Sequence, residues 1–146
     1  MTENRLHRTS VMEHLAFTSD LDLQGFCKRF QKALNLPEFS FDDENETEWG
    51  FVEVGSVEYN VSRPYKPGTL QIWDKSVPPG CNFGVSLILY GEHPDSYNHE
   101  SAVDHLVVPV AQKIADEFRI TVHYHRTWLG VGQSVERNMV FRPQAT

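Results

Sequence analysis

Histidine is the residue type in this chain that suggests a metal site. His123 and His125 lie two residues apart in a segment patterned as a strand, so both side chains would point to one face. Two imidazoles on one face are a common start of a zinc site, which needs three or four ligands. His93, Asp95 and His99 are candidates for the remaining positions. No motif fixes their distance from the pair, and solvent-facing strand histidines are the common alternative, so we predict no metal or cofactor.

The sequence contains no catalytic motif. Ser86 lies in Gly84-Val85-Ser86-Leu87, which lacks the second glycine of the turn that presents a nucleophilic serine. Gly130-Val131-Gly132 lacks the third glycine, or the following lysine and hydroxyl residue, of a phosphate-binding loop. Carboxylates for acid–base work are plentiful, but a general base also needs a hydrogen-bonded partner and a pocket, which the sequence does not display. We therefore expect that the protein is not an enzyme.

A dense acidic segment dominates the charge pattern. The 30 residues 33–62 hold eight carboxylates and no lysine or arginine. These are Glu38, Asp42, Asp43, Glu44, Glu46, Glu48, Glu53 and Glu58. The whole chain has 20 acidic and 13 basic residues, so this segment is the source of the net charge of −7. It should attract a basic partner and repel nucleic acid and anionic membranes. The alternative is a solvated hairpin that only keeps the protein in solution.

Aromatic residues are interleaved with these carboxylates. Trp49, Phe51 and Tyr59 lie within the acidic segment, and Tyr65 and Trp73 follow it. Tyrosine and tryptophan often dominate interface energies, although Trp49, Phe51 and Trp73 could equally fill the core. Tyr65 lies in a proline-containing loop, where we expect it to be exposed. The predicted partner-binding residues are Asp42, Asp43, Glu44, Glu46, Glu48, Trp49 and Tyr65.

Length and composition indicate one domain. The chain has 146 residues, 40% of them hydrophobic, which suffices for a core. Residues 1–11 are polar without periodicity, so we expect a flexible N-terminus followed by a single domain at 12–146. No apolar run reaches the roughly 18 residues of a membrane span, and no signal peptide is visible. Two distant cysteines and scattered basic residues favour a reduced, cytoplasmic protein that binds neither membrane nor nucleic acid.

Periodicity in the first half predicts a strand, a helix and a set of hairpins. A strand is expected at 14–18, and Ser19 or Asp20 would cap the helix that follows. The helix has apolar residues at Phe26, Cys27, Phe30, Ala33 and Leu34, and ends before Pro37. Period-two alternation then predicts antiparallel strands that carry the acidic segment, near 39–41, 49–54 and 57–61, with a tight turn at Gly55-Ser56.

The second half predicts a central strand, a second helix and a final hairpin. We expect a short extended piece at 70–73 and, at 83–90, a central strand buried on both faces. Apolar residues at helical spacing predict a helix over 100–118, in which Pro109 should cause a kink or leave one backbone hydrogen bond unmade. Strands at 120–128 and 138–142 would pair across 130–132. The order β-α-β-β-β-β-α-β-β predicts an α+β domain, a largely antiparallel sheet with two helices packed on it.

One segment resembles a known class of proteins. Residues 58–91, EYNVSRPYKPGTLQIWDKSVPPGCNFGVSLILYG, are similar to segments of small bacterial immunity proteins encoded beside polymorphic or contact-dependent toxins. The resemblance implies 1:1 inhibition of a cognate toxin domain, often a basic nuclease, by covering its active site or a nearby surface. Two other functions stay open: a metal-binding protein or small metal-dependent enzyme using His123 and His125, and an acidic adaptor subunit of another complex.

Overall fold

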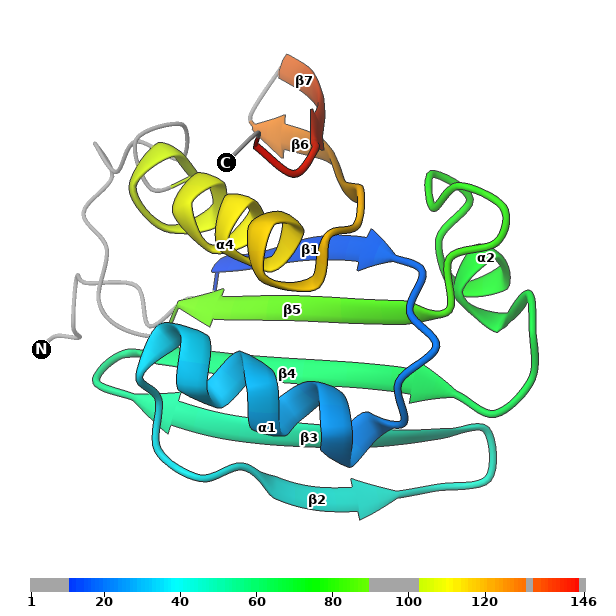
Figure 1. Cartoon of the computed structure of the whole chain (residues 1–146). Helices are drawn as coiled ribbons and strands as arrows, with labels where there is room; N and C mark the ends of the chain where they lie inside the picture. Colours follow the sequence, from blue (N-terminus) through cyan, green and yellow to red (C-terminus); the bar gives the residue numbers. More distant parts are fainter. Residues whose placement is uncertain (1–10, 90–102, 131–132, 145–146) are drawn as a thin grey trace, which may run out of the picture.

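A seven-stranded antiparallel sheet is the framework of this α+β fold. The computed structural model describes residues 11–89, 103–130 and 133–144. Its elements are β1 (Val11–Phe17), α1 (Leu23–Leu34), β2 (Ser40–Asp43), β3 (Thr47–Val54), β4 (Val57–Pro64), α2 (Thr69–Trp73), β5 (Phe83–Leu89), a π-helical turn (Val103–Val107), α4 (Val108–Phe118), β6 (Val122–Gly130) and β7 (Gln133–Phe141). The strand order is β2-β3-β4-β5-β1-β6-β7. Helices α1 and α4 pack on one face of this sheet (Figure 1), which confirms the predicted fold class.

The core lies between that face and the two helices. Phe26 of α1 stacks on Phe17 of β1, with ring centroids 5.1 Å apart, and lies equally close to Phe83 of β5. The buried side chains of α4 are Val110, Ala111, Ile114 and Ala115. Strand β5 is central, as predicted, but its two faces differ. Phe83, Val85 and Leu87 are fully buried under the helices. On the other face Ile88 is buried, whereas Gly84 and Ser86 are only half-buried.

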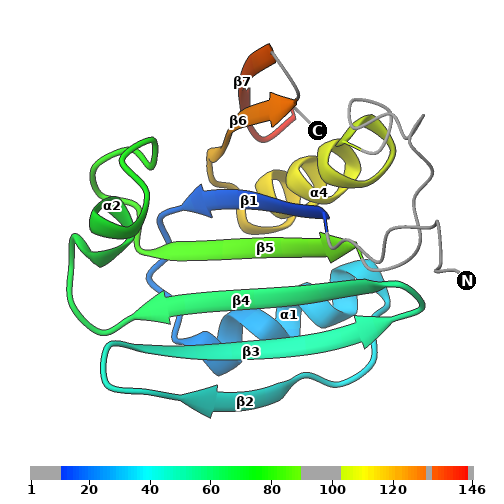
Figure 2. The same cartoon turned by 180° about the vertical axis from the view of Figure 1, so that it is seen from behind.

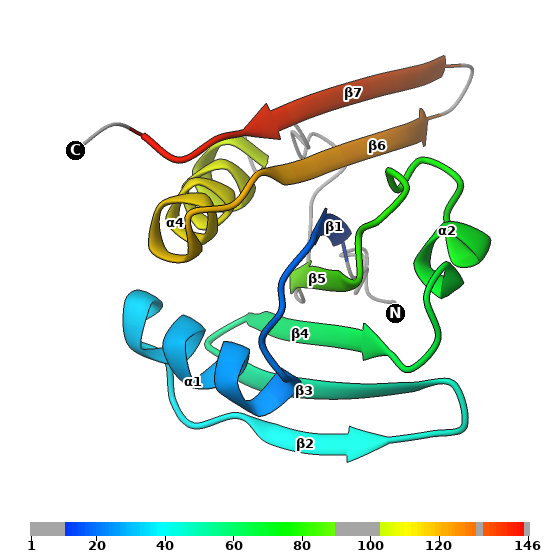
Figure 3. The same ribbon diagram turned by 45° about the vertical axis from the view of Figure 1, so that its right-hand side comes forward.

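The second face of the sheet carries neither α1 nor α4. Figure 2 views the molecule from that side, with the strands in front of α1. The short helix α2 and the loop after it lie on this side, opposite α1 and α4 (Figure 3). Leu70 of α2 approaches Gly84 of β5, where an added Cβ would lie 3.6 Å from its Cδ2 atom. We call this side the α2 face, because it carries the short helix α2 but neither of the long helices.

Helix α2 corrects the expectation of an extended piece at residues 70–73. Thr69, Ile72 and Trp73 favour strands, but tertiary contacts decide the conformation here. Leu70 is buried, and the side-chain amide of Gln71 donates to the carbonyls of Pro78 at 2.8 Å and Cys81 at 3.2 Å. The loop that returns to β5 therefore holds residues 69–73 as one helical turn.

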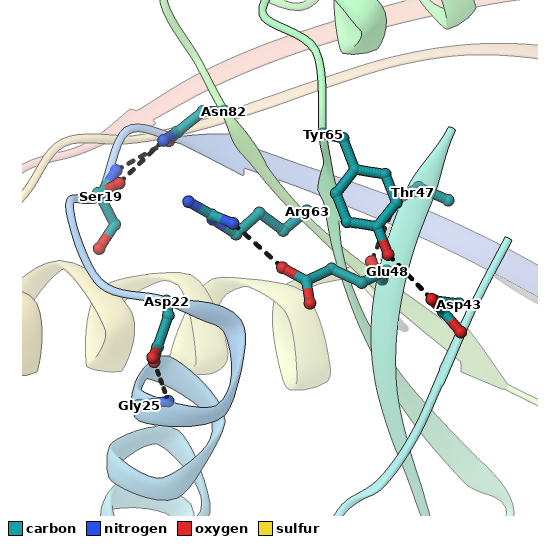
Figure 4. Close-up of polar contacts among 9 residues, drawn as sticks. All are labelled: Ser19, Asp22, Gly25, Asp43, Thr47, Glu48, Arg63, Tyr65 and Asn82. Atoms are coloured by element: carbon teal, nitrogen blue, oxygen red, sulfur yellow. Dashed lines mark hydrogen bonds and ion pairs between the residues drawn. The ribbon is translucent and has the colours of Figure 1, made fainter. Parts of the chain in front are cut away.

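Two predicted details of the helices also change. Asp22 caps α1, accepting a hydrogen bond from the Gly25 amide at 2.7 Å, rather than Ser19 or Asp20. Ser19 is instead held by Asn82, which accepts from its amide at 2.9 Å and donates to its carbonyl at 2.8 Å (Figure 4). Pro109 lies in the first turn of α4, directly after the π-helical turn at Val103–Val107. The hydrogen-bonding pattern of this helical segment therefore changes just before the proline, which has no N–H to donate.

The hairpins agree with the sequence pattern. Gly55, with φ of 61°, forms the tight turn between β3 and β4. Strands β6 and β7 pair from Val122 opposite Phe141 to Gly130 opposite Gln133, as predicted, although β7 is longer than expected. Val11 already pairs with Leu89, so β1 begins inside the segment predicted to be flexible, and residues 1–10 lie outside the described part. Within the described residues, no helix is long and apolar enough to span a bilayer.

Candidate functional site

Four of the predicted partner-binding carboxylates lie together at one edge of the sheet. Asp42 and Asp43 end β2, the outermost strand, and Glu44 and Glu46 lie in the turn to β3 (Figure 2). All four are exposed. Within the described part of the chain, none of them forms an ion pair with a lysine or arginine. We call these four residues the acidic surface.

The outer side of β2 also offers backbone hydrogen-bonding groups. The Glu44 amide donates to the Thr47 carbonyl at 2.8 Å, which makes these two residues a hydrogen-bonded pair. Such pairs alternate along antiparallel strands, so Asp42 bonds to β3 while the amide and carbonyl groups of Phe41 and Asp43 point outward. The Asp43 amide donates to the side chain of Asp42 at 2.8 Å. The remaining outward groups are available to an added strand.

Glu48 differs from the acidic surface because it is paired within the chain. It lies opposite Arg63 in the β3–β4 register, and Arg63 Nη1 donates to Glu48 Oε2 at 3.0 Å (Figure 4). Both side chains are partly buried, 28% exposed for Glu48 and 34% for Arg63. The pair neutralises one carboxylate of the acidic segment, so Glu48 contributes less free charge than its neighbours.

Tyr65 is exposed, as predicted, and joins the acidic surface through a hydrogen bond. Its hydroxyl donates to Asp43 Oδ2 at 3.1 Å (Figure 4), while half of the residue (51%) remains accessible. Loss of hydration, together with the hydrogen bond and the negative charge of Asp43, raises the pKa of Tyr65. The tyrosine is thereby placed beside the carboxylates rather than in the core.

The predicted partner-binding residues lie close together, but they are divided between the two faces of the sheet. Asp43 and Glu48 are register partners on the helix side, where Gly50 also approaches Cys27 of α1. Asp42 pairs with Trp49 on the α2 face, and Trp49 is half-buried there. Of the other aromatic residues, Phe51 and Trp73 are exposed rather than core-filling. A partner approaching the β2 edge would meet both faces of the hairpin.

A second site, which the sequence did not predict, lies on the α2 face. It is a cleft of about 320 Å³ between β1, β5, β6 and the α2 loop. Its polar lining includes His14, Asp74, Ser86, His123 and His125, which we call the histidine cleft. His14 and Ser86 are register partners, and His14 Nδ1 lies 2.9 Å from Ser86 Oγ. His123 and His125 share this face, as their spacing predicts.

Asp74 and His14 influence each other electrostatically. Partial burial favours the neutral acid at Asp74, but hydrogen bonds from the Ser76 amide and hydroxyl, at 2.9 and 2.6 Å, oppose it. With the nearby His14 and His125 they leave the pKa of Asp74 below its ordinary value. Desolvation lowers the pKa of His14, against a smaller opposing effect of Asp74. At neutral pH the cleft therefore combines a charged carboxylate with an uncharged His14.

A metal site at the histidines is not seen among the described residues. The described residues contain no group of three or more histidine, cysteine, aspartate or glutamate side chains arranged to hold a metal. His93, Asp95 and His99 lie outside those residues. The two cysteines, Cys27 and Cys81, are free and buried, and burial raises the pKa of Cys27 to about 12.

Sequence reasoning missed the cleft because its residues are distant in the chain. His14 and His123 meet only because β1 lies between β5 and β6, an order that local patterns do not specify. A weak signal was present: His14 and Ser86 are polar residues on strands whose other positions are largely apolar.

No protein-family model, curated protein or solved structure matches this chain. The resemblance of residues 58–91 to immunity proteins thus gains no support from these comparisons. Within the described part of the chain, the acidic surface and the histidine cleft are the features on which we base the proposals below.

Proposed function

We propose that this chain is a cytoplasmic immunity protein that binds one basic toxin domain, 1:1, and blocks its activity. The observation that carries the proposal is the position of the acidic surface. Its four carboxylates occupy an exposed sheet edge and, among the described residues, form no ion pair with a lysine or arginine. Unpaired surface charge of one sign is what a partner of opposite charge can use.

The partner's expected chemistry follows from charge complementarity. A nuclease must be basic where it holds phosphates, because neutralising phosphates supplies much of its affinity for nucleic acid. A carboxylate-rich surface can occupy the same basic region. Electrostatic attraction over several ångströms accelerates the encounter, and close contacts then determine the lifetime of the complex. A nuclease domain is accordingly the toxin class that we favour.

The β2 edge supplies contacts beyond charge. The outward backbone groups of Phe41 and the outward carbonyl of Asp43 allow a partner strand to add to the sheet, a common mode of peptide recognition. Phe41, 42% exposed, and Tyr65 lie beside these groups and provide aromatic area for tight contact. Charge, edge pairing and aromatic contact therefore converge on one hairpin.

Co-expression with the product of the gene directly upstream tests this function. We expect a 1:1 complex by size-exclusion chromatography with mass determination, and loss of the toxin domain's activity in the complex. A complex in which the partner keeps its activity would favour an adaptor subunit instead. Absence of any complex at low salt would refute the immunity proposal for that gene pair.

A further inference from the structure

The histidine cleft has the charge of a cation site at neutral pH. Its described lining residues include one carboxylate, Asp74, and no lysine or arginine. An anionic ligand would face that carboxylate without a counter-charge. A metal ion would need three preformed ligands, and the described residues do not provide such a group. A cation that needs one carboxylate and neutral acceptors fits this lining better.

Asp74 is prepared to receive such a ligand. Both hydrogen bonds from Ser76 reach Oδ1, which fixes the orientation of the carboxylate. Among the described residues, no hydrogen bond reaches Oδ2. A planar guanidinium or an ammonium group could therefore donate to Oδ2 without displacing an existing contact, and charge-assisted bonds of this kind are the stronger ones.

Trp73 supplies a second element of cation recognition. The residue immediately precedes Asp74, lines the same cleft and is 50% exposed. Such exposure is unusual for a tryptophan, which normally buries most of its large apolar surface. An indole face beside a carboxylate attracts organic cations because the negative face of the ring adds to the ionic attraction.

We propose that the histidine cleft binds a guanidinium or alkylammonium group, with Asp74 as counter-ion and Trp73 as aromatic partner. The group is either a free small cation or an arginine or lysine side chain presented by another protein. A cavity of about 320 Å³ accommodates one side chain of this size. The inference does not rest on the proposed function, because it concerns a different face of the molecule and is tested without a toxin.

Titration of the purified chain with three small probes, followed by NMR, tests the chemistry. The probes are agmatine, N-acetyl-arginine methylamide and its neutral isostere N-acetyl-citrulline methylamide. We expect both cations to shift the Trp73 indole N–H and His14 ring signals, with the citrulline compound at least about tenfold weaker, a difference of 1.4 kcal/mol. Binding of agmatine alone would indicate a free cation, whereas binding of both indicates that a protein side chain also fits.

Two variants and a control locate the site. Asp74→Asn should weaken binding of agmatine at least about tenfold, and Trp73→Leu about threefold or more. Glu38→Gln removes an exposed carboxylate outside the cleft lining and should leave the affinity unchanged. Asp74→Asn also changes the acceptor of the two Ser76 hydrogen bonds. The comparison of the three probes on the unaltered chain involves no substitution and is not affected by this change. Binding of the citrulline compound as tightly as the cations, no shift with either cation, or shifts confined to residues 42–46 would overturn the proposal.

Discussion

The Tyr65 hydroxyl donates a hydrogen bond to Asp43 Oδ2 at 3.1 Å, joining the loop after β4 to the edge strand β2. Strand β3 lies between these two segments, so the bond spans the width of the acidic hairpin. It orients one carboxylate of the acidic surface and holds an exposed aromatic ring beside it. Charge and apolar contact area are thus coupled at one place.

Because of this bond, we expect the pKa of Tyr65 to depend on Asp43. Since desolvation, the hydrogen bond and the charge of Asp43 raise the pKa of Tyr65, Asp43→Asn should lower that pKa toward the ordinary value of about 10. Asp42→Asn, on the opposite face, is the matched control and should have a smaller effect. Absorbance titration of each variant with and without Tyr65→Phe isolates this tyrosine. An equal effect of the two substitutions would show that the hydrogen bond is not responsible.

The ion pair between Glu48 and Arg63 should stabilise the fold more than an exposed pair does. Glu48→Gln should lower the free energy of unfolding by about 1 kcal/mol, because both partners are partly buried and solvent screens them incompletely. Glu117→Gln, which breaks the more exposed pair with Arg29, should cost at most about 0.5 kcal/mol. Urea denaturation compares the two. Equal losses would mean that burial of the Glu48 pair contributes nothing.

Gly50 should not tolerate a side chain while Cys27 and Phe41 keep their positions. An added Cβ would lie 2.8 Å from the Phe41 ring and 3.1 Å from the Cys27 sulfur. We expect Gly50→Ala to destabilise the fold by about 1–2 kcal/mol through overpacking. In a Cys27→Ala background the cost should fall, because the sulfur is gone, and thermal unfolding of the four proteins measures this coupling. Strict additivity would contradict the predicted close approach.

His14 should titrate below its ordinary pKa of 6.5, and removal of Asp74 should lower its pKa further. Desolvation disfavours the imidazolium, while Asp74 partly compensates, so Asp74→Asn removes the only compensating influence identified. The groups facing His14 are Ser86 on β5, His123 and His125 on β6, and Asp74 after α2. NMR titration of the ring protons tests this. An upward shift in Asp74→Asn would refute the assigned influence of Asp74.

The same depression of the His14 pKa has a consequence for stability. The unfolded chain takes up the histidine proton at a higher pH than the folded chain. The contribution of His14 to the free energy of unfolding is therefore fully present above a pH of about 6.5, its ordinary pKa. It is lost as the pH falls through the pKa that His14 has in the folded chain. The lowered pKa of Asp74 acts in the same direction at lower pH. In His14→Gln, the free energy of unfolding should fall less steeply as the pH drops below about 6.5.

Local patterns predicted most elements, because burial on one face imposes a clear period. Phe26, Cys27 and Phe30 mark the inner side of α1, and alternation marks β3 and β4. The pattern failed at residues 70–73, where Leu70 and Gln71 are held by a distant loop. Such contacts leave no local signal.

The candidate sites divide in the same way. The acidic surface is contiguous in sequence, so its charge was visible, although the pairing of Glu48 with Arg63 required the β3–β4 register. The histidine cleft combines residues from β1, β5, β6 and the α2 loop. Only the complete strand order brings His14 and Asp74 to one cleft, and the sequence alone does not determine that order.

The association rate with the toxin domain, measured against ionic strength, tests the central claim most directly. The test variant neutralises three residues of the acidic surface, Asp42→Asn, Asp43→Asn and Glu46→Gln. The control makes the same change in net charge at three exposed carboxylates elsewhere, Asp20→Asn, Glu38→Gln and Glu53→Gln.

At low salt we expect the test variant to associate at least about tenfold more slowly than the unaltered chain, and the control within about threefold. The difference should shrink toward 0.5 M salt because screening shortens the reach of these charges. Equal rates for the test variant and the control would contradict the proposal that the β2 edge receives the partner.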